Sequence, residues 1–302
     1  MSTLSSELVY LNEHGYYEVS QKPTPEELRA YYAQRYYQES LSSYQKDYSA
    51  EELEHVEGRL RLHHWVLQQQ LQTSAPATGA APSFLDIGSG EGWALAYFRR
   101  QGWNVLGVDF SRFSLEKFHP DLLPYFRAGD LYEELQRLAD EGQHFDVLWL
   151  DNVLEHVLAP ADLLRLCRRL VSPGGVLMVD VPNDFSVLQQ YLLERGHIDR
   201  PFWIALPDHL SYFSHAGLRN LAAATGWRTT KVIGDQPIDL NLLNPATNYV
   251  RTREAGPGAH RARLEQDNLL MRTAPLPAVA AYYEGLAGVG LGRSIVAFLQ
   301  PA

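Results

Sequence analysis

The segment from Phe84 to Gly92, FLDIGSGEG, constrains the fold of this chain most strongly. An apolar strand-like run leads into three glycines, Gly88, Gly90 and Gly92, and a helix-like run begins at Trp93. Glycines permit a tight turn and let a ligand approach the backbone, while a helix N-terminus presents free N–H groups. In open parallel sheets the first turn of this kind is the usual ligand crevice. The segment therefore predicts a ligand-binding α/β domain.

Apolar strand-like runs and helix-like runs alternate after this turn. Helices are expected at 92–101, 161–170 and 215–225, and strands at 83–87, 104–108, 124–128, 145–150, 175–181, 227–233 and 293–299. Near-continuous apolar strands that alternate with helices indicate a parallel sheet buried on both faces.

Three regions of different character divide the chain. Residues 1–75 have helical patterns and are expected to form an N-terminal helical cap. Residues 83–235 and 291–302 carry the alternating strands and helices of the main domain. The stretch between them, 236–290, is too long for a hairpin and includes a polar helix-like run at 260–272, so it is expected to be an insertion or lid.

Charge and cysteine content exclude several classes of function. The net charge of −10 argues against nucleic acid as the main partner, because phosphate binding needs clustered Lys and Arg. The one cysteine, Cys167, permits no disulfide framework, fits a cytoplasmic protein and is expected to lie in the core. No membrane segment is expected, because no run approaches about 18 consecutive apolar residues. A homodimer is one oligomeric state that the sequence allows.

The spacing of the glycines separates two kinds of nucleotide ligand. In the dinucleotide pattern G-x-G-x-x-G the third glycine would fall on Trp93, so the chain does not match it. The chain has G-x-G-x-G instead, with Asp86 two residues before the first glycine. Asp109 ends the next expected strand, where a carboxylate can accept hydrogen bonds from both ribose hydroxyls. The turn and Asp109 together predict an adenosine-type ligand.

These residues resemble the first motifs of the class I S-adenosylmethionine-dependent methyltransferases, in particular the small-molecule branch of types 12 and 23. Later segments resemble further motifs of that family in the expected order: AGDL at 128–131, FDVLWLDNVLEH at 145–156 and LVSPGGV at 170–176. The resemblance covers about residues 83 to 235. It implies an α/β, Rossmann-like doubly wound sheet of about seven strands, mostly parallel with an antiparallel last strand. It also implies S-adenosyl-L-methionine as the cofactor.

The resemblance implies which side chains contact this methyl donor. Asp109 would hold the ribose, Asp130 and Leu131 would frame the adenine, and Asp151 or Asn152 would face the sulfonium. The complete expected set is Asp86, Gly88, Ser89, Gly90, Asp109, Phe110, Asp130, Leu131, Asp151, Asn152 and Tyr48.

Two N-terminal features extend this expectation. In similar enzymes an aromatic side chain before the domain closes over the methionine end of the donor, and Tyr44 or Tyr48 would do so here, with packing as the alternative. Arg59 or Arg61 could pair with the donor carboxylate, and the alternative is a solvated helix face.

Two histidines are candidates for proton transfer from the acceptor. A general base is needed only where the acceptor loses a proton, as a hydroxyl does, and imidazole titrates near neutral pH. His209 lies in LPDHLSYFS, which resembles a segment of the small-molecule branch, and its alternative role is to tether a loop. His156, beside Glu155 in DNVLEH, is the second candidate, with a buried structural role as the alternative.

Acceptor contacts are expected from Asn183, Trp203 and Tyr212, with a turn cap and ordinary packing as the alternatives. No group of His, Asp or Glu has the spacing of a zinc site, so no metal is expected. The run RTREAGPGAHRARLE at 251–265 is locally basic. It could meet a phosphate or carboxylate of the acceptor, or it could be a solvated insert or an oligomer contact.

The function expected from these features is methyl transfer to a small-molecule acceptor. A hydroxyl of a sugar, nucleotide-linked sugar or natural product is preferred over nitrogen or carbon. Two other functions stay open. One is an NAD-dependent dehydrogenase, against which the glycine spacing argues, and the other is a non-catalytic module that binds S-adenosylmethionine, because donor motifs and acceptor chemistry are separable.

Overall fold

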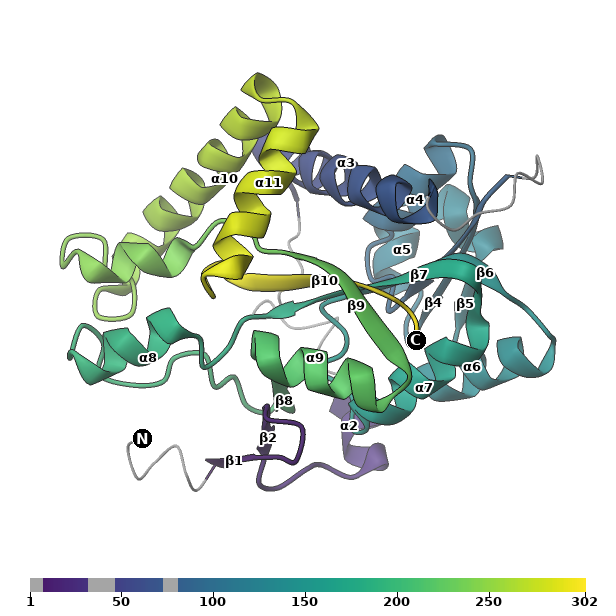
Figure 1. Ribbon diagram of the computed structural model, residues 1–302, viewed down its shortest axis with the longest axis horizontal. Helices are drawn as coiled ribbons and strands as arrows, with labels where there is room; N and C mark the ends of the chain where they lie inside the picture. Colours follow the sequence, from purple (N-terminus) through teal and green to yellow (C-terminus); the bar gives the residue numbers. More distant parts are fainter. Residues whose placement is uncertain (1–7, 32–46, 73–80) are drawn as a thin grey trace.

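One seven-stranded sheet organises the chain (Figure 1). The computed structural model describes residues 8–31, 47–72 and 81–302. The strands are β3 (Ser83–Ile87), β4 (Asn104–Asp109), β5 (Phe126–Ala128), β6 (Phe145–Asp151), β7 (Val171–Pro182), β9 (Trp227–Ile233) and β10 (Ser294–Pro301). Their order is β5-β4-β3-β6-β7-β10-β9, and β10 runs antiparallel to both of its neighbours while the pairs from β5 to β7 are parallel. The predicted α/β sheet with an antiparallel last strand is confirmed.

Both faces of the sheet are covered, because successive residues of a strand point to opposite sides. In β6, Leu148 and Leu150 join one core cluster, whereas Val147 and Trp149 join the other. The first cluster is covered by α6 (Leu131–Asp140), α7 (Pro160–Leu170) and α9 (His215–Ala224). The second is covered by α3 (Ala50–Gln72), α4 (Trp93–Arg100), α5 (Phe113–Phe118), the 3-10 helix η2 (Pro120–Tyr125) and α11 (Leu276–Gly288). Cys167 of α7 is a buried core residue, as expected.

The N-terminal region contains strands that the sequence did not predict. Strands β1 (Val9–Leu11) and β2 (Tyr17–Val19) form an antiparallel pair, and β2 pairs with β8 (Ser211–Tyr212) to make a separate small sheet. Helix α2 (Pro25–Tyr31) follows, and its start is capped reciprocally: the Thr24 N–H donates to Glu27 Oε2, and the Glu27 N–H donates to Thr24 Oγ1. Three-residue strands carry little periodic signal, and they are held here by pairing with a segment about 190 residues away.

The long connection between β9 and β10 folds against α3 at the end of the sheet where the parallel strands finish (Figure 1). It contains the 3-10 helices η3 (Ile238–Leu243) and η4 (Arg253–Ala255), and the helices α10 (Gly256–Thr273) and α11. Asn268 Nδ2 donates to the Glu51 carbonyl at 2.9 Å, which joins α10 to the start of α3. Helix α8 (Val187–Glu194) follows β7. In the three described ranges no helix is both long enough and apolar enough to cross a membrane.

Candidate active site

The glycine turn after β3 has a backbone that only glycine adopts easily. Gly88, Gly90 and Gly92 have φ of 76°, 51° and 83°. A Cβ at Gly88 would lie 2.5 Å from Val153 Cγ2, and one at Gly92 would lie 2.3 Å from Leu115 Cδ1. The turn therefore needs both the positive φ and the missing side chains, and it leaves the backbone open toward the end of β3.

Asp109 ties the end of β4 to this turn. Its carboxylate is 5% exposed, Oδ2 accepts the Gly90 N–H at 2.8 Å, and Oδ1 accepts the Ser111 N–H at 3.1 Å. Asp86, inside β3, is buried, and burial raises its pKa well above the usual range, with Asp151 and Asp109 adding to the rise. The two acidic residues singled out by the sequence thus flank the glycines.

A cavity of about 480 Å³ opens beside the turn. Nine of the expected site residues line it: Tyr48, Asp86, Gly88, Ser89, Gly90, Asp151, Asn152, His156 and His209. Four others, Asp109, Phe110, Asp130 and Leu131, lie beyond its lining, at and after the ends of β4 and β5. Asp130 caps α6, because its Oδ1 accepts the N–H groups of Tyr132 and Glu133 at 3.0 and 3.3 Å. Tyr44 lies outside the described residues. We call the cavity beside the glycine turn the first cavity.

Glu91 joins Tyr48 to the glycine turn, and the sequence reasoning missed it. Its Oε2 accepts the Tyr48 hydroxyl at 2.5 Å and the Trp93 Nε1–H at 2.6 Å. Its Oε1 is buried and has no hydrogen-bond partner among the described residues. The spacing Gly90-Glu91-Gly92 was the available signal, since any side chain inside such a turn lies beside the ligand crevice.

The two candidate histidines meet across the first cavity. Their rings pack edge-on with centroids 4.8 Å apart, and His156 Nδ1 lies 2.8 Å from the Asp208 carbonyl oxygen. Burial lowers the pKa of His209 to about 3, with a contribution from His156. Glu155, 1% exposed, has its Oε1 3.7 Å from His156 Nε2, and burial raises its pKa well above the usual range.

These three side chains also form a group that could hold a metal ion. One ligand atom from each of Glu155, His156 and His209 lies within 4.8 Å of the others. The sequence analysis expected no metal, because His156 and His209 are separated by 52 residues and show no ligand spacing. The fold brings them together when the segment after α8 returns to the end of β6, where Leu210 and Ser211 N–H groups bind the Glu155 carbonyl.

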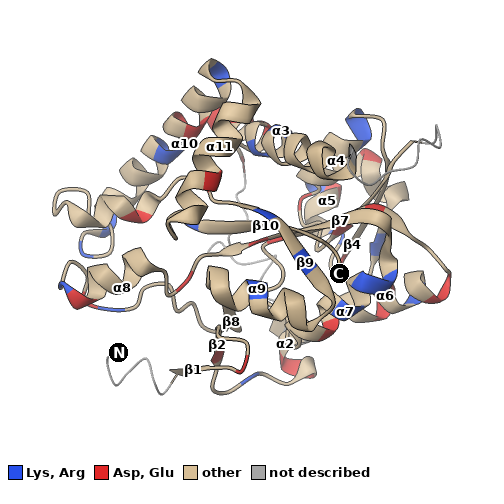
Figure 2. Ribbon diagram, viewed as in Figure 1, with Lys and Arg blue, Asp and Glu red and all other residues tan. Residues whose placement is uncertain are grey.

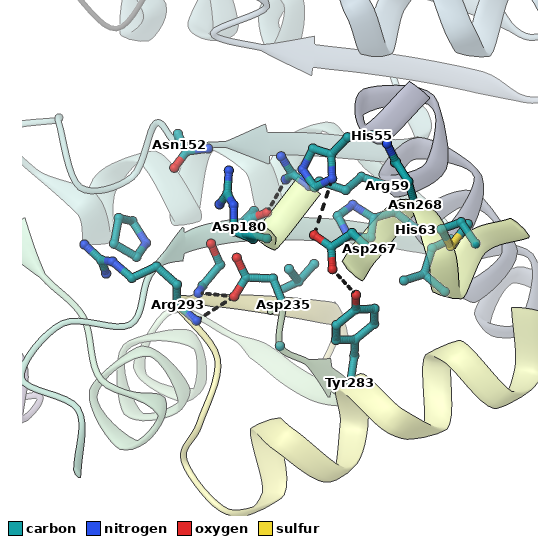
Figure 3. A pocket seen from close by; sticks show the side chains of 17 residues that line it. His55, Arg59, His63, Asn152, Asp180, Asp235, Asp267, Asn268, Tyr283 and Arg293 are labelled. Atoms are coloured by element: carbon teal, nitrogen blue, oxygen red, sulfur yellow. Dashed lines mark hydrogen bonds and ion pairs between the residues drawn. The ribbon is translucent and has the colours of Figure 1, made fainter. Parts of the chain in front are cut away.

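A second cavity, of about 330 Å³, adjoins the first, and Arg59, Asn152 and Pro182 line both. Its walls come from α3, α10, α11, the ends of β7 and β9 and the start of β10 (Figure 3). Arg59 Nη2 lies 2.7 Å from Asp180 Oδ2 and 3.6 Å from Asp151 Oδ2. Arg59 therefore links the two cavities electrostatically, and the expectation of an arginine near the donor points to this residue and not to Arg61.

The three expected acceptor contacts lie elsewhere. Asn183 is buried and donates from Nδ2 to the carbonyls of Gly290 and Gly292 at 3.2 and 3.0 Å. Trp203 and Tyr212 are buried in a third core cluster. None of the three lines either cavity. In the basic run 251–265, Arg263 lines the second cavity, whereas Arg251 binds the carbonyls of Gly196 and His197.

Comparison with known proteins agrees with this geometry. Residues 53–232, well over half of the chain, match the family described as "Methyltransferase domain". A ubiquinone biosynthesis O-methyltransferase of Ralstonia nicotianae is 38% identical over 108 residues, which cover 35% of this chain and 44% of that relative. The enzyme of the same name from Marinobacter nauticus is 29% identical over 188 residues, covering 56% of this chain and 77% of that relative.

A solved structure shows the same fold. It is a SAM-dependent methyltransferase from Archaeoglobus fulgidus, with a TM-score of 0.51 and 18% identity over 82% of this chain and 93% of that one. The chain therefore belongs to the methyltransferase-domain family and has the fold of the class I S-adenosylmethionine-dependent methyltransferases.

Proposed function

We propose that the chain transfers a methyl group from S-adenosylmethionine to a hydroxyl of a small molecule, at the first cavity. The observation that carries the proposal is the lining of that cavity, which combines a glycine turn tied to Asp109 with the His156–His209 pair. A turn of this kind at the end of the first parallel strand is the ligand crevice of open α/β sheets.

The charge of the first cavity supports a cationic donor. Five acidic side chains line it, Asp86, Glu91, Asp151, Glu155 and Asp208, together with one arginine, Arg59. S-adenosylmethionine carries a sulfonium, an ammonium and a carboxylate, so it has one net positive charge. The acidic lining favours the two cations, and Arg59 can pair with the carboxylate.

Each end of the donor has a matching group in this proposal. Asp109 accepts hydrogen bonds from the ribose, and Asp130 and Leu131 with Phe110 border the adenine at the ends of β4 and β5. The buried Glu91 Oε1, which has no partner among the described residues, is placed to receive the ammonium, and Tyr48 covers that end. Gly88 and Gly90 have no side chain at the turn, so the donor can approach its backbone closely.

The donor supplies an electrophilic methyl that an acceptor oxygen displaces in line, breaking the sulfur–carbon bond and leaving a neutral thioether. Positioning provides much of the acceleration of such a step. The hydroxyl proton must leave as the new bond forms, and His209 or His156 accepts it in this proposal. Burial keeps the pKa of both histidines below the usual value, so they are unprotonated at neutral pH and able to accept hydrogen bonds.

The choice of oxygen as the methylated atom rests on the relatives, whose names describe O-methyltransferases. A sugar, nucleotide-linked sugar or natural product is the acceptor class that we propose. Release of S-adenosylhomocysteine, measured with a panel of hydroxyl, amine and activated-carbon acceptors, tests the function. We expect turnover with hydroxyl acceptors. We also expect His209→Gln to lose this turnover while it still binds S-adenosylhomocysteine. Turnover with amines alone would overturn the assignment of oxygen, and no turnover with any class would favour a binding module.

A further inference from the structure

We infer that the second cavity is the acceptor pocket and that it selects a neutral, polyhydroxylated ring, either as a free small molecule or as the sugar part of a larger acceptor. The inference rests on the proposed function, since an acceptor must lie beside the donor methyl. The wall shared by the two cavities, formed by Arg59, Asn152 and Pro182, is where the two ligands would meet. At about 330 Å³ the pocket has the size of a small-ligand site.

The charges of this pocket are balanced internally (Figure 3). Arg59 pairs with Asp180 at 2.7 Å, and Arg293 Nη1 pairs with Asp184 at 2.9 Å behind the lining. Asp235 Oδ1 accepts the backbone N–H groups of Arg293 and Ser294 at 2.5 and 2.8 Å. The lining has equal numbers of arginines (Arg59, Arg263 and Arg293) and aspartates (Asp180, Asp235 and Asp267), so neither an anion nor a cation is favoured by an excess of one sign.

Asp267 of α10 has two uncharged partners, because burial lowers the pKa of His55 to about 3. Its Oδ1 accepts the Tyr283 hydroxyl, and its Oδ2 lies 3.3 Å from His55 Nδ1. Helix α10 carries both basic and acidic residues (Figure 2), and one of each sign, Arg263 and Asp267, lines the pocket. A ligand with a strong charge of its own would therefore disturb existing ion pairs.

The side chains that line the pocket include both hydrogen-bond donors and acceptors that have no partner in the described part of the chain. Asp180 Oδ1 and Asn268 Oδ1 are acceptors, and Arg263 Nε is a donor; all three atoms are buried without a hydrogen-bond partner among the described residues. The Asp180 and Asn268 side chains belong to residues that are 1% and 4% exposed. Buried polar atoms are nearly always bonded, so unpaired ones in side chains that line a cavity indicate a ligand. The pocket thus needs a partner that both donates and accepts.

A hydroxyl group meets this requirement, because it carries one donor hydrogen and two acceptor lone pairs. An amine cation has no lone pair that could accept a hydrogen bond from Arg263. A carboxylate or phosphate has no hydrogen to donate to the acceptor oxygens of Asp180 and Asn268. Leu62, Met271 and Val296 add an apolar patch against which the C–H face of a saturated ring could pack. A polyol ring satisfies all of these groups together.

The test uses the full chain saturated with S-adenosylhomocysteine and measures binding by titration calorimetry and saturation-transfer NMR. The probes are methyl glycosides of glucose, galactose, mannose and rhamnose, with myo-inositol; catechol, 4-hydroxybenzoate and ethanolamine represent the other classes. We expect at least one polyol to bind more tightly than the other probes. Arg263→Gln should weaken it at least tenfold, and Arg261→Gln, an exposed arginine on the same helix, should not.

Three results would overturn the assignment: none of the polyols binds, catechol or ethanolamine binds best, or Arg263→Gln leaves polyol binding unchanged. Retained affinity for S-adenosylhomocysteine shows that Arg263→Gln is folded. If S-adenosylhomocysteine itself does not bind, the proposed function fails; the polyol arm is then repeated on the free protein, where the same dependence on Arg263 would still support the pocket.

Discussion

Two glycines at the ends of α4 allow the steric requirement of the donor turn to be measured against a matched control. Gly92 precedes α4 and Gly102 follows it, and both have φ of 83°. An alanine Cβ at Gly92 would lie 2.3 Å from Leu115 Cδ1, whereas at Gly102 it would have no atom within 4 Å among the described residues. Gly92→Ala and Gly102→Ala therefore share the backbone strain and differ in the contact with Leu115.

The expected costs follow from these two terms. The left-handed conformation costs a non-glycine residue about 1–2 kcal/mol, and this applies to both variants. Leu115 is fully buried, so it cannot move aside freely, and overpacking of a core typically adds about 1–3 kcal/mol. We expect Gly102→Ala to lose about 1–2 kcal/mol of unfolding free energy and Gly92→Ala about 2–5 kcal/mol, from a total that is typically about 5–15 kcal/mol.

Donor binding should also differ between Gly92→Ala and Gly102→Ala. Strain at Gly92 moves the turn that carries Gly90, and Gly90 is bonded to Asp109. Urea unfolding followed by circular dichroism measures the stability, and calorimetry with S-adenosylhomocysteine measures donor binding. Gly92→Ala should weaken donor binding at least tenfold, and Gly102→Ala should leave it within twofold. Equal losses of stability and equal donor affinities in the two variants would refute the steric argument.

Two further predictions concern groups whose pKa is shifted by burial. His209, with its pKa lowered to about 3, should stay neutral from pH 8 down to about pH 4; an NMR titration assigned with His209→Gln should show no midpoint near the usual value of about 6.5, and a midpoint there would contradict its burial. Burial raises the pKa of Asp267 to about 6, so the folded chain binds this proton more tightly than the unfolded chain. Protonated Asp267 therefore stabilises the fold fully below about pH 4, and this stabilisation is lost as the pH rises through about 6. Asp267→Asn should therefore gain up to about 2–3 kcal/mol relative to wild type between pH 4 and 7 in urea unfolding; a difference that does not change with pH would show that Asp267 does not titrate in this way.

The sequence predicted the sheet well because each of its strands carries a local signal. Runs such as SFLDI and FDVLWL are apolar at nearly every position, which is what burial on both faces demands. The glycine turn was also a local signal, since positive φ and missing side chains select one residue type. The second helix of the insertion, α11, gave no clear boundary, because its start is marked only by proline and it contains small apolar residues throughout.

The acceptor side could not be predicted in the same way, because it is assembled from distant segments. His55 and Arg59 come from α3, Asp180 from β7, and Arg263 and Asp267 from the insertion. No spacing in the sequence relates these residues to one another. Asn183 and Tyr212, both expected to contact the acceptor, have the alternative roles: Asn183 Nδ2 bonds the loop before β10, and Tyr212 packs in a core cluster.

The account depends most on the donor binding at the glycine turn with Asp109 as its ribose ligand. Titration calorimetry of S-adenosylhomocysteine, with wild type and Asp109→Ala, measures this directly. We expect one site per chain in the wild type and a loss of at least tenfold in affinity in Asp109→Ala, since a hydrogen bond to a charged group is worth about 1.5–3 kcal/mol. NAD should not bind. Binding of NAD without S-adenosylhomocysteine, or S-adenosylhomocysteine affinity that does not depend on Asp109, would contradict the account.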